Sequence, residues 1–446
     1  MNKKLILFFL LLMLSGQFSS AQDSLMTVDK AIELILKNNF SITISRNQSD
    51  IAKNNNTAGN AGELPQLSLN ATGSSASNNI KQVYSTGTDF SKNDVLSNNL
   101  NAYASLNWTI FDGLNMFALK SQYQELEAQG DLNLKIQIEN TIEQTIQIYF
   151  NIVQQQQLVK ALNEEIAVSE ERAKIADRKF SNGSGSKLDL LQAKVDLNAQ
   201  RSALMKQQTA LEESKVNLNQ LLARSLDTRF GVADTVIISY HPSYDQLNTS
   251  VFQRNNELQF TEKNIHLSQL NLKEIQSLRY PRISLTGNYV FSKVDNQAGF
   301  TLLNQNQGFN YGFTATMPLF NGFTSSTGAG SGYSIHSAVK NAKLGILNSQ
   351  LQFDQTKLVI ESSLMNVYRE FEDNKQVLKL EEENIQYARE SMNIALERFR
   401  VGLSTFVDFK VAQTGFEDAM SRLVAARYNT KVSETALMRL NGYLVK

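Results

Sequence analysis

Two aspartates, Asp189 and Asp408, are the residues whose type and spacing most suggest a chemical role. Each lies six residues after a glycine, Gly183 or Gly402, and three residues after a hydroxyl residue. The second spacing fits a capping box, in which an acidic side chain accepts from the backbone N–H of the residue that begins a helix. Carboxylates gathered around an opening would instead favour cations and could bind a metal ion. The sequence leaves both interpretations open: a structural cap, and a gate or selectivity element.

The other residues that could do chemistry form no site. The run Gly328, Gly330 and Gly332 lacks the spacing and βαβ context of a nucleotide fingerprint, so we interpret it as a link between a strand and a helix. The three histidines lie far apart, and the absence of cysteine excludes thiolate chemistry. Paired glutamates amid Gln, Lys and Arg are typical of a solvated helix face: Glu164, Glu165, Glu170 and Glu171. We therefore expect no catalytic residue, cofactor or metal site, and no enzyme.

The composition indicates long helices and argues against nucleic acid as a partner. The 446 residues include only four prolines, whereas average proteins contain roughly 5 %. Because proline interrupts helices, the proline-free stretches 66–241 and 319–446 predict long ones. The 43 basic residues balance the 43 acidic residues, but a general nucleic-acid binder usually has a basic excess.

Residues 1–21 have the features of a secretory signal peptide. Two lysines precede an apolar run (5–14), and Ser19 and Ala21 occupy the −3 and −1 positions of a cleavage site before Gln22. The run is too short for a spanning helix of about 20 residues, and no comparable run follows. We expect an exported chain without a transmembrane helix, and without a lipid anchor because no cysteine follows the cleavage site.

The mature chain contains an internal duplication. Three short segments of the first half recur in the same order in the second, at offsets of about 210 to 220 residues: 64–69 with 280–285, 110–113 with 319–322, and 179–183 with 398–402. Each similarity alone is weak, but three at nearly one offset indicate a repeated unit. We predict two structural repeats, 22–240 and 241–446, each with a helix, two strands and two long helices.

Period-two alternation predicts the strands. Apolar and polar residues alternate over 66–72, 101–110, 282–289 and 311–317. The intervening segments, 74–100 and 292–309, are rich in Asn, Ser, Gly and Thr, which predicts loops. One apolar and one uncharged polar face suit a membrane strand of about 9–11 residues between lipid and a lumen, although a soluble sandwich shows the same alternation. Trp108, Tyr289 and Tyr311 fall on the apolar face, where interfacial aromatic residues belong.

The long helices carry a coiled-coil signature. Stretches 114–180 and 333–400 would each extend about 100 Å at 1.5 Å per residue. Leucines form a strict heptad with small or polar neighbours: Leu190, Leu197, Leu204, Leu211 and Leu218. This seam is narrower than the apolar stripe of a globular helix. Taken alone, it equally fits a soluble periplasmic coiled-coil scaffold or adhesin.

Strands and helices together predict a shared membrane barrel. Four strands cannot close a barrel, and open edges in lipid leave unpaired backbone groups. Two copies give eight strands, whose interior side chains fill, whereas three give twelve and enclose a lumen. We predict a homotrimer in outer-membrane lipid of a Gram-negative bacterium, with a twelve-stranded barrel continuous with a long α-helical coiled-coil barrel in the periplasm. Gly113 and Gly322 mark the strand–helix joints, where glycine permits the required turn.

These segments resemble the TolC family of outer-membrane efflux proteins over the whole mature chain. The similarity rests on 64–67, on 318–322, and on 398–404 followed by Asp408 and Ala412. It implies a passive exit duct, coupled to an inner-membrane pump through a periplasmic adaptor protein. It also implies that the helix–helix turns form a periplasmic tip that narrows the closed tunnel and docks the adaptor: Gly183, Ser184, Val401, Gly402, Leu403 and Ser404. The same architecture serves type I protein secretion, and the sequence does not separate that role from efflux.

Overall fold

The computed structural model describes residues 25–87, 89–299, 301–317 and 332–444. The predicted signal peptide, the Gly322 joint, and Gly328 and Gly330 of the glycine run lie outside these ranges. Clustering of contacts divides the chain into two compact units. One comprises residues up to Ser45, Lys135–Asn256 and the part from Leu358 onward, and the other comprises Arg46–Leu134 and Glu257–Lys357. Each unit therefore draws on both halves of the sequence.

The long helices appear where the proline-free stretches predict them. Helix α4 spans Asn115–Ser181 and α8 spans Gly332–Arg400; each is followed by a second helix, α5 (Lys187–Leu221) and α9 (Phe406–Leu440). The leucine heptad is the packed face of α5, because Leu190 and Leu218 are buried and the three leucines between them are partly buried. None of the helices in the described ranges is both long and apolar enough to cross a membrane.

The shorter helix that opens each half is broken at an asparagine. The pairs are α2 (Val28–Asn38) with α3 (Phe40–Asn55), and α6 (Tyr244–Arg254) with α7 (Asn256–Ser277). At the first break Asn39 Nδ2 donates to the Leu221 carbonyl at 2.9 Å, and at the second Asn255 Nδ2 donates to the Leu440 carbonyl at 3.0 Å. Leu221 and Leu440 end α5 and α9, whose last carbonyls lack intrahelical partners. In both halves, therefore, an asparagine at the helix break bonds the carbonyl that ends the last long helix of that half.

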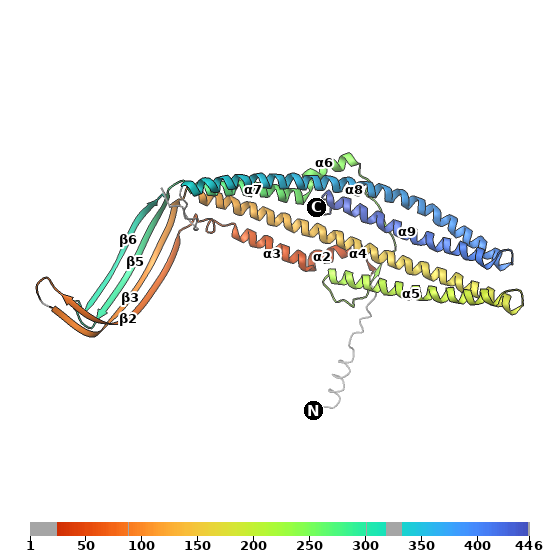
Figure 1. The fold of residues 1–446 in the computed structure, drawn as a ribbon, viewed down its shortest axis with the longest axis horizontal. Coiled ribbons are helices and arrows are strands. Elements are labelled where there is room, and N and C mark those ends of the chain that lie inside the picture. Colours follow the sequence, from red (N-terminus) through yellow and green to blue (C-terminus); the bar gives the residue numbers. More distant parts are fainter. Residues whose placement is uncertain (1–24, 88, 300, 318–331, 445–446) are drawn as a thin grey trace, which may run out of the picture. The chain divides into compact units, whose positions relative to one another are not determined.

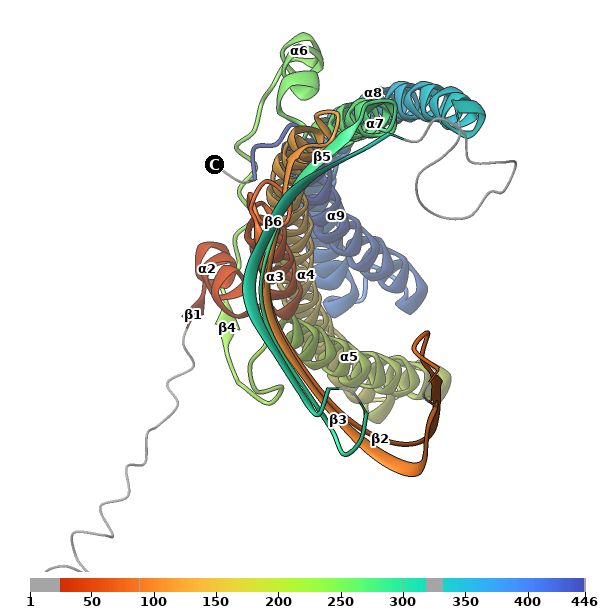
Figure 2. The same ribbon diagram turned by 90° about the vertical axis from the view of Figure 1, so that its left-hand side faces the viewer.

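Four long strands form one curved antiparallel sheet in the order β2-β3-β5-β6 (Figures 1 and 2). Their bounds are Gln66–Val83, Asp89–Phe111, Arg282–Asn296 and Leu303–Thr316. The prediction of loops over 74–100 and 292–309 is therefore wrong. Antiparallel pairing continues through these polar segments, and the turns between the paired strands contain Gly87 and Gly299, whose φ angles are positive at +83° and +123°.

The register aligns the apolar residues of all four strands on one face. Leu69 pairs with Ala104, Ala104 with Tyr289, and Tyr289 with Phe309. The adjacent row on that face is Leu67, Leu106, Gly287 and Tyr311. Directly opposed residues in a sheet project to the same side. Most of this face is uncovered in the single chain, with Leu69 82 % and Tyr311 81 % exposed.

The unit that contains α5 and α9 has two apolar cores. One surrounds Tyr149, whose hydroxyl donates to the Met26 carbonyl at 2.9 Å beside the short parallel pair β1 (Leu25–Met26) and β4 (Gly231–Val232). The other lies beneath the helix-hairpin turns and contains Phe399, Phe406 and Phe409. This second core positions the candidate site.

Candidate functional site at the helix-hairpin turns

The α4–α5 and α8–α9 turns have the same backbone geometry. Gly183 and Gly402 have φ of +72° and +83°, which a side chain would disfavour. The N–H groups of Gly183 and Ser184 bond the carbonyls of Phe180 and Lys179 at 3.0 and 2.9 Å. The second turn repeats both bonds 219 residues later, at 3.2 and 2.8 Å. This pattern is a Schellman motif, so each long helix ends at a fixed residue and reverses direction there.

The two predicted aspartates differ in what they do at the start of the following helix. Thr405 and Asp408 form a capping box: the Thr405 N–H donates to Asp408 Oδ2 at 3.0 Å, and the Asp408 N–H donates to Thr405 Oγ1 at 3.1 Å. Bonds from the Thr405 hydroxyl and N–H lower the pKa of Asp408. In α5 the Ser186 hydroxyl accepts from Leu188 N–H at 3.1 Å, without a reciprocal bond from Asp189. The cap interpretation therefore holds for Asp408 and not for Asp189.

A groove of about 750 Å³ runs beside the second turn, between α8 and α9. It contains Ser404 and Asp408, together with Tyr387, Ile394 and Arg398. The residues that project at the two turns are largely exposed and partly apolar: Gly183, Ser184, Val401, Gly402 and Leu403 are exposed, and Ser404 is partly exposed. The first turns of α5 and α9 add Leu188 and Val407, with exposed fractions of 71 % and 65 %. The turns thus present an uncovered, mixed apolar and polar surface.

Aromatic rings and cations fix the two hairpins to each other below the turns. Phe399 of α8 stacks on Phe409 of α9 with ring centroids 5.7 Å apart. Lys179 of α4 lies over the Phe399 ring at 4.2 Å and donates to the Phe399 carbonyl at 2.8 Å. Arg172 of α4 lies over the Phe406 ring at 5.0 Å. Contacts of this kind stabilise one arrangement of the turns.

The solvated-face interpretation of the paired glutamates is wrong for one of them. Glu164, Glu170 and Glu171 form surface ion pairs with Arg389, Arg201 and Arg400. Glu165, however, is buried. Sequence reasoning missed that residues 165, 169 and 172 are spaced by one helical turn and share the inner face of α4. In the part of the chain that the structure describes, no group of three or more His, Asp or Glu side chains could hold a metal ion.

The first strand–helix joint requires glycine for two reasons. Gly113 lies between β3 and α4 with φ of +74°. A Cβ there would lie 2.3 Å from the Ser277 carbonyl oxygen and 2.9 Å from Tyr280 Cβ. Asp112 accepts from the Met116 N–H at 3.1 Å, which caps the start of α4. The joint is therefore held against the end of α7.

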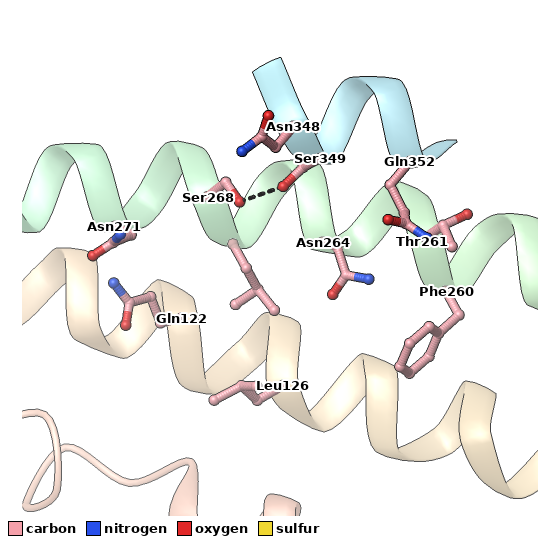
Figure 3. A pocket seen from close by; sticks show the side chains of 11 residues that line it. Gln122, Leu126, Phe260, Thr261, Asn264, Ser268, Asn271, Asn348, Ser349 and Gln352 are labelled. Atoms are coloured by element: carbon pink, nitrogen blue, oxygen red, sulfur yellow. Dashed lines mark hydrogen bonds between the residues drawn. The ribbon is translucent and has the colours of Figure 1, made fainter. Parts of the chain in front are cut away.

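A second groove, of about 780 Å³, lies between α4, α7 and α8 and is lined by amide and hydroxyl side chains (Figure 3). Ser268 of α7 and Ser349 of α8 share a hydrogen bond of 2.7 Å across it. No charged residue lines this groove. Three apolar side chains, Leu126, Phe260 and Leu267, line it as well, so its surface is mixed and uncharged.

Comparison with known proteins assigns the chain to a family. The model of the family described as outer membrane efflux protein matches residues 31–224 and 248–443, which is most of the sequence. The chain belongs to this family. The outer membrane efflux protein BepC of Brucella suis biovar 1 (strain 1330) is 21 % identical over 435 residues, covering 96 % of this chain and 88 % of BepC.

This chain shares its fold with outer-membrane proteins of known structure. VceC of Vibrio cholerae superposes with a TM-score of 0.76 at 14 % identity, covering 93 % of this chain and 96 % of VceC. The CmeC outer membrane channel of Campylobacter jejuni gives 0.77 at 17 % identity, covering 93 % and 85 %. The chain is an outer-membrane protein, and its relatives are efflux proteins and channels.

Proposed function

We propose that three copies of this chain form a passive duct through the outer membrane, the exit of a tripartite efflux system. The observation that carries the proposal is the four-stranded sheet, which ends in two unpaired edges, β2 and β6. In lipid each unpaired backbone N–H and C=O is strongly unfavourable, so the edges must pair with other copies. Three copies give twelve strands, the smallest closed number with a lumen wide enough for transport.

The sheet's two faces support this arrangement. The aligned rows of Leu67, Leu69, Tyr289, Phe309 and Tyr311 form an apolar surface suited to lipid. The opposite face carries hydroxyl pairs such as Ser68 and Ser105, whose oxygens are 2.6 Å apart. Alternation of apolar and polar residues between lipid and lumen is typical of membrane barrels.

Trimer formation and conduction test the barrel. Purified protein should migrate as a trimer on gels without heating and as a monomer after heating, and should form channels in planar bilayers. Proline within the edge strand β6, such as Asn310→Pro, should abolish the trimer because proline cannot donate to a strand ladder and disturbs the edge that would pair with the next copy. Proline in a turn, such as Ala298→Pro, is the matched control. A monomer that conducts, or a trimer that survives the edge proline, contradicts the proposal.

The hairpin turns suit docking of a periplasmic adaptor that connects the duct to an inner-membrane pump. Their exposed surface supports this role, because apolar residues such as Val401, Leu403 and Val407 are left uncovered in the single chain. Replacing Leu403 by Asp should reduce recovery of the adaptor in cross-linking and impair efflux, without loss of trimers. Leu302→Asp, an exposed leucine in the β5–β6 turn, is the control. Equal adaptor recovery from both variants would place docking elsewhere.

A further inference from the structure

A buried carboxyl between the hairpins has no cation. Glu165 of α4 is 7 % exposed, and within the described ranges no Lys, Arg or His lies at salt-bridge distance from it. The charges that act on it are all negative: Glu417 and Asp418 from α9, and Glu164 on its own helix. A buried charge without a partner is among the least favourable features in a protein core.

The cations around Glu165 are engaged by other carboxylates. Arg172 Nη2 lies 2.9 Å from Asp196 of α5, and Lys410 Nζ of α9 lies 3.0 Å from the same carboxylate. Arg389 of α8 pairs with Glu164 at 3.5 Å. Burial alone would raise the pKa of Asp196, but bonds from Lys410 and Gln192 and the charge of Arg172 lower it, so that carboxylate stays ionised. All three of these cations are paired with carboxylates other than Glu165.

The hydrogen bonds of this layer also lack donors for two acceptors. Glu417 Oε1 accepts from Gln413 at 2.9 Å and from Gln200 at 2.6 Å, and Gln413 donates again to Ser169 at 2.8 Å. These contacts leave Oε1 of Gln200 and Oε1 of Gln413 buried without a donor. The layer therefore holds surplus acceptors as well as surplus negative charge. A proton on a carboxyl of this layer would remove one negative charge and supply one donor.

We propose that Glu165 is a proton-binding site in the core of the hairpins, and that its bound proton holds α4 against α9. Loss of the proton leaves a buried carboxylate facing Glu417, which favours separation of the helices and entry of water. Burial, with the charge of Glu417 next, raises the pKa of Glu165 to about 8. Because this pKa is raised, the stabilisation is complete below the ordinary Glu pKa of about 4.3 and is lost as the pH rises through about 8. The site depends on packing within one chain, so it stands or falls independently of the duct.

Infrared spectroscopy of the full-length protein in detergent micelles tests the proton directly. The C=O stretch of a protonated carboxylic acid should persist at neutral pH and disappear near pH 8 in the wild type, and should be absent at neutral pH in Glu165→Gln. Glu164→Gln removes the neighbouring, exposed carboxyl, whose charge is a smaller cause of the raised pKa of Glu165, and should leave the band present at neutral pH. Loss of the band at the ordinary Glu pKa of about 4.3 overturns the proposal.

Hydrogen exchange tests the consequence for packing. The ratio of the wild-type to the Glu165→Gln exchange rate in α4 and α9 should rise about 100-fold between pH 6 and pH 9, since only the wild type releases a proton when the helices separate, and the rise should level off above about pH 8. Glu417→Gln removes a negative charge that raises the pKa of Glu165, so that pKa should fall. The rise should then level off at a lower pH and be smaller. A ratio that stays constant with pH overturns the proposal.

Discussion

Substitution of the joint glycine, Gly113→Ala, should open the strand–helix joint far more than the same change at a hairpin turn. Gly113 has φ of +74° and Gly183 has φ of +72°, so both variants place an L-residue in left-handed backbone at roughly 1–2 kcal/mol. Reduced freedom of the unfolded chain offsets about 0.4–1 kcal/mol in each case. The net cost of Gly183→Ala is therefore about 1 kcal/mol, because its Cβ meets nothing within 4 Å.

At Gly113 a steric term is added. The new Cβ would lie 2.3 Å from the Ser277 carbonyl oxygen and 2.9 Å from Tyr280 Cβ, and the first of these is backbone that cannot rotate away. Forced displacement of packed atoms costs typically about 1–3 kcal/mol. The total for Gly113→Ala is therefore about 3 kcal/mol, equivalent to roughly a 100-fold increase in local opening.

Hydrogen exchange followed by mass spectrometry resolves the two sites separately. Peptides covering 111–118 and 277–285 should exchange about 100-fold faster in Gly113→Ala, whereas peptides at 180–187 should exchange about 5-fold faster in Gly183→Ala. Trimer yield should fall only for the joint variant, because the joint sets the direction in which the strands leave the helices. Equal effects of the two substitutions would refute the steric argument.

Three further changes probe the helix ends. Asn255→Ala removes the donor to the Leu440 carbonyl and should lower stability by about 1–3 kcal/mol, with a similar loss for Asn39→Ala; chemical unfolding followed by circular dichroism measures both. Bonds from Thr405 lower the pKa of Asp408, so its cap is present above the ordinary Asp pKa of about 3.9 and is lost as the pH falls further. Hydrogen exchange in the first turn of α9 should therefore become faster in acid for the wild type. This acid dependence should be lost in Asp408→Asn and kept in the control variant Asp189→Asn. If both aspartates line a cation-selective opening, the double Asn variant should show lower cation selectivity in planar bilayers, and unchanged selectivity leaves Asp408 only its cap.

The helices were predictable from sequence and the full strands were not. Two proline-free stretches with heptad spacing predict α4, α5, α8 and α9, because only local information is needed. The polar segments 74–100 and 292–309 have the composition of loops, yet outside their turns most residues pair with a residue of a neighbouring strand. Composition reflects the local conformational preference of a segment, whereas strand pairing also depends on a partner strand that can be far away in the sequence. Gly87 and Gly299 were the available signals for the true turns, since each has the positive φ that a turn requires.

The site residues also divide into those set by local sequence and those set by contacts between distant helices. The turn glycines and the Thr405–Asp408 cap follow from local spacing, and the structure contains both. Burial of Glu165 does not follow from local spacing, because Glu164 beside it is exposed and the groups that act on Glu165 include Glu417 and Asp418 of the distant helix α9. Side chains that depend on contact between distant helices are therefore the ones that sequence reasoning misassigns.

The duplication shows which features belong to the shared backbone and which to one half alone. At an offset of 219 residues, Gly183 corresponds to Gly402, and both turns keep the same hydrogen bonds. At that offset Glu165 corresponds to Asn384, and Arg172 corresponds to Ser391; both counterparts are exposed on α8. The buried polar layer is therefore not a consequence of the repeat, which can be built without it. A layer that leaves acceptors unpaired is costly to maintain, so its presence on α4 alone favours a specific role in holding the first hairpin to α9.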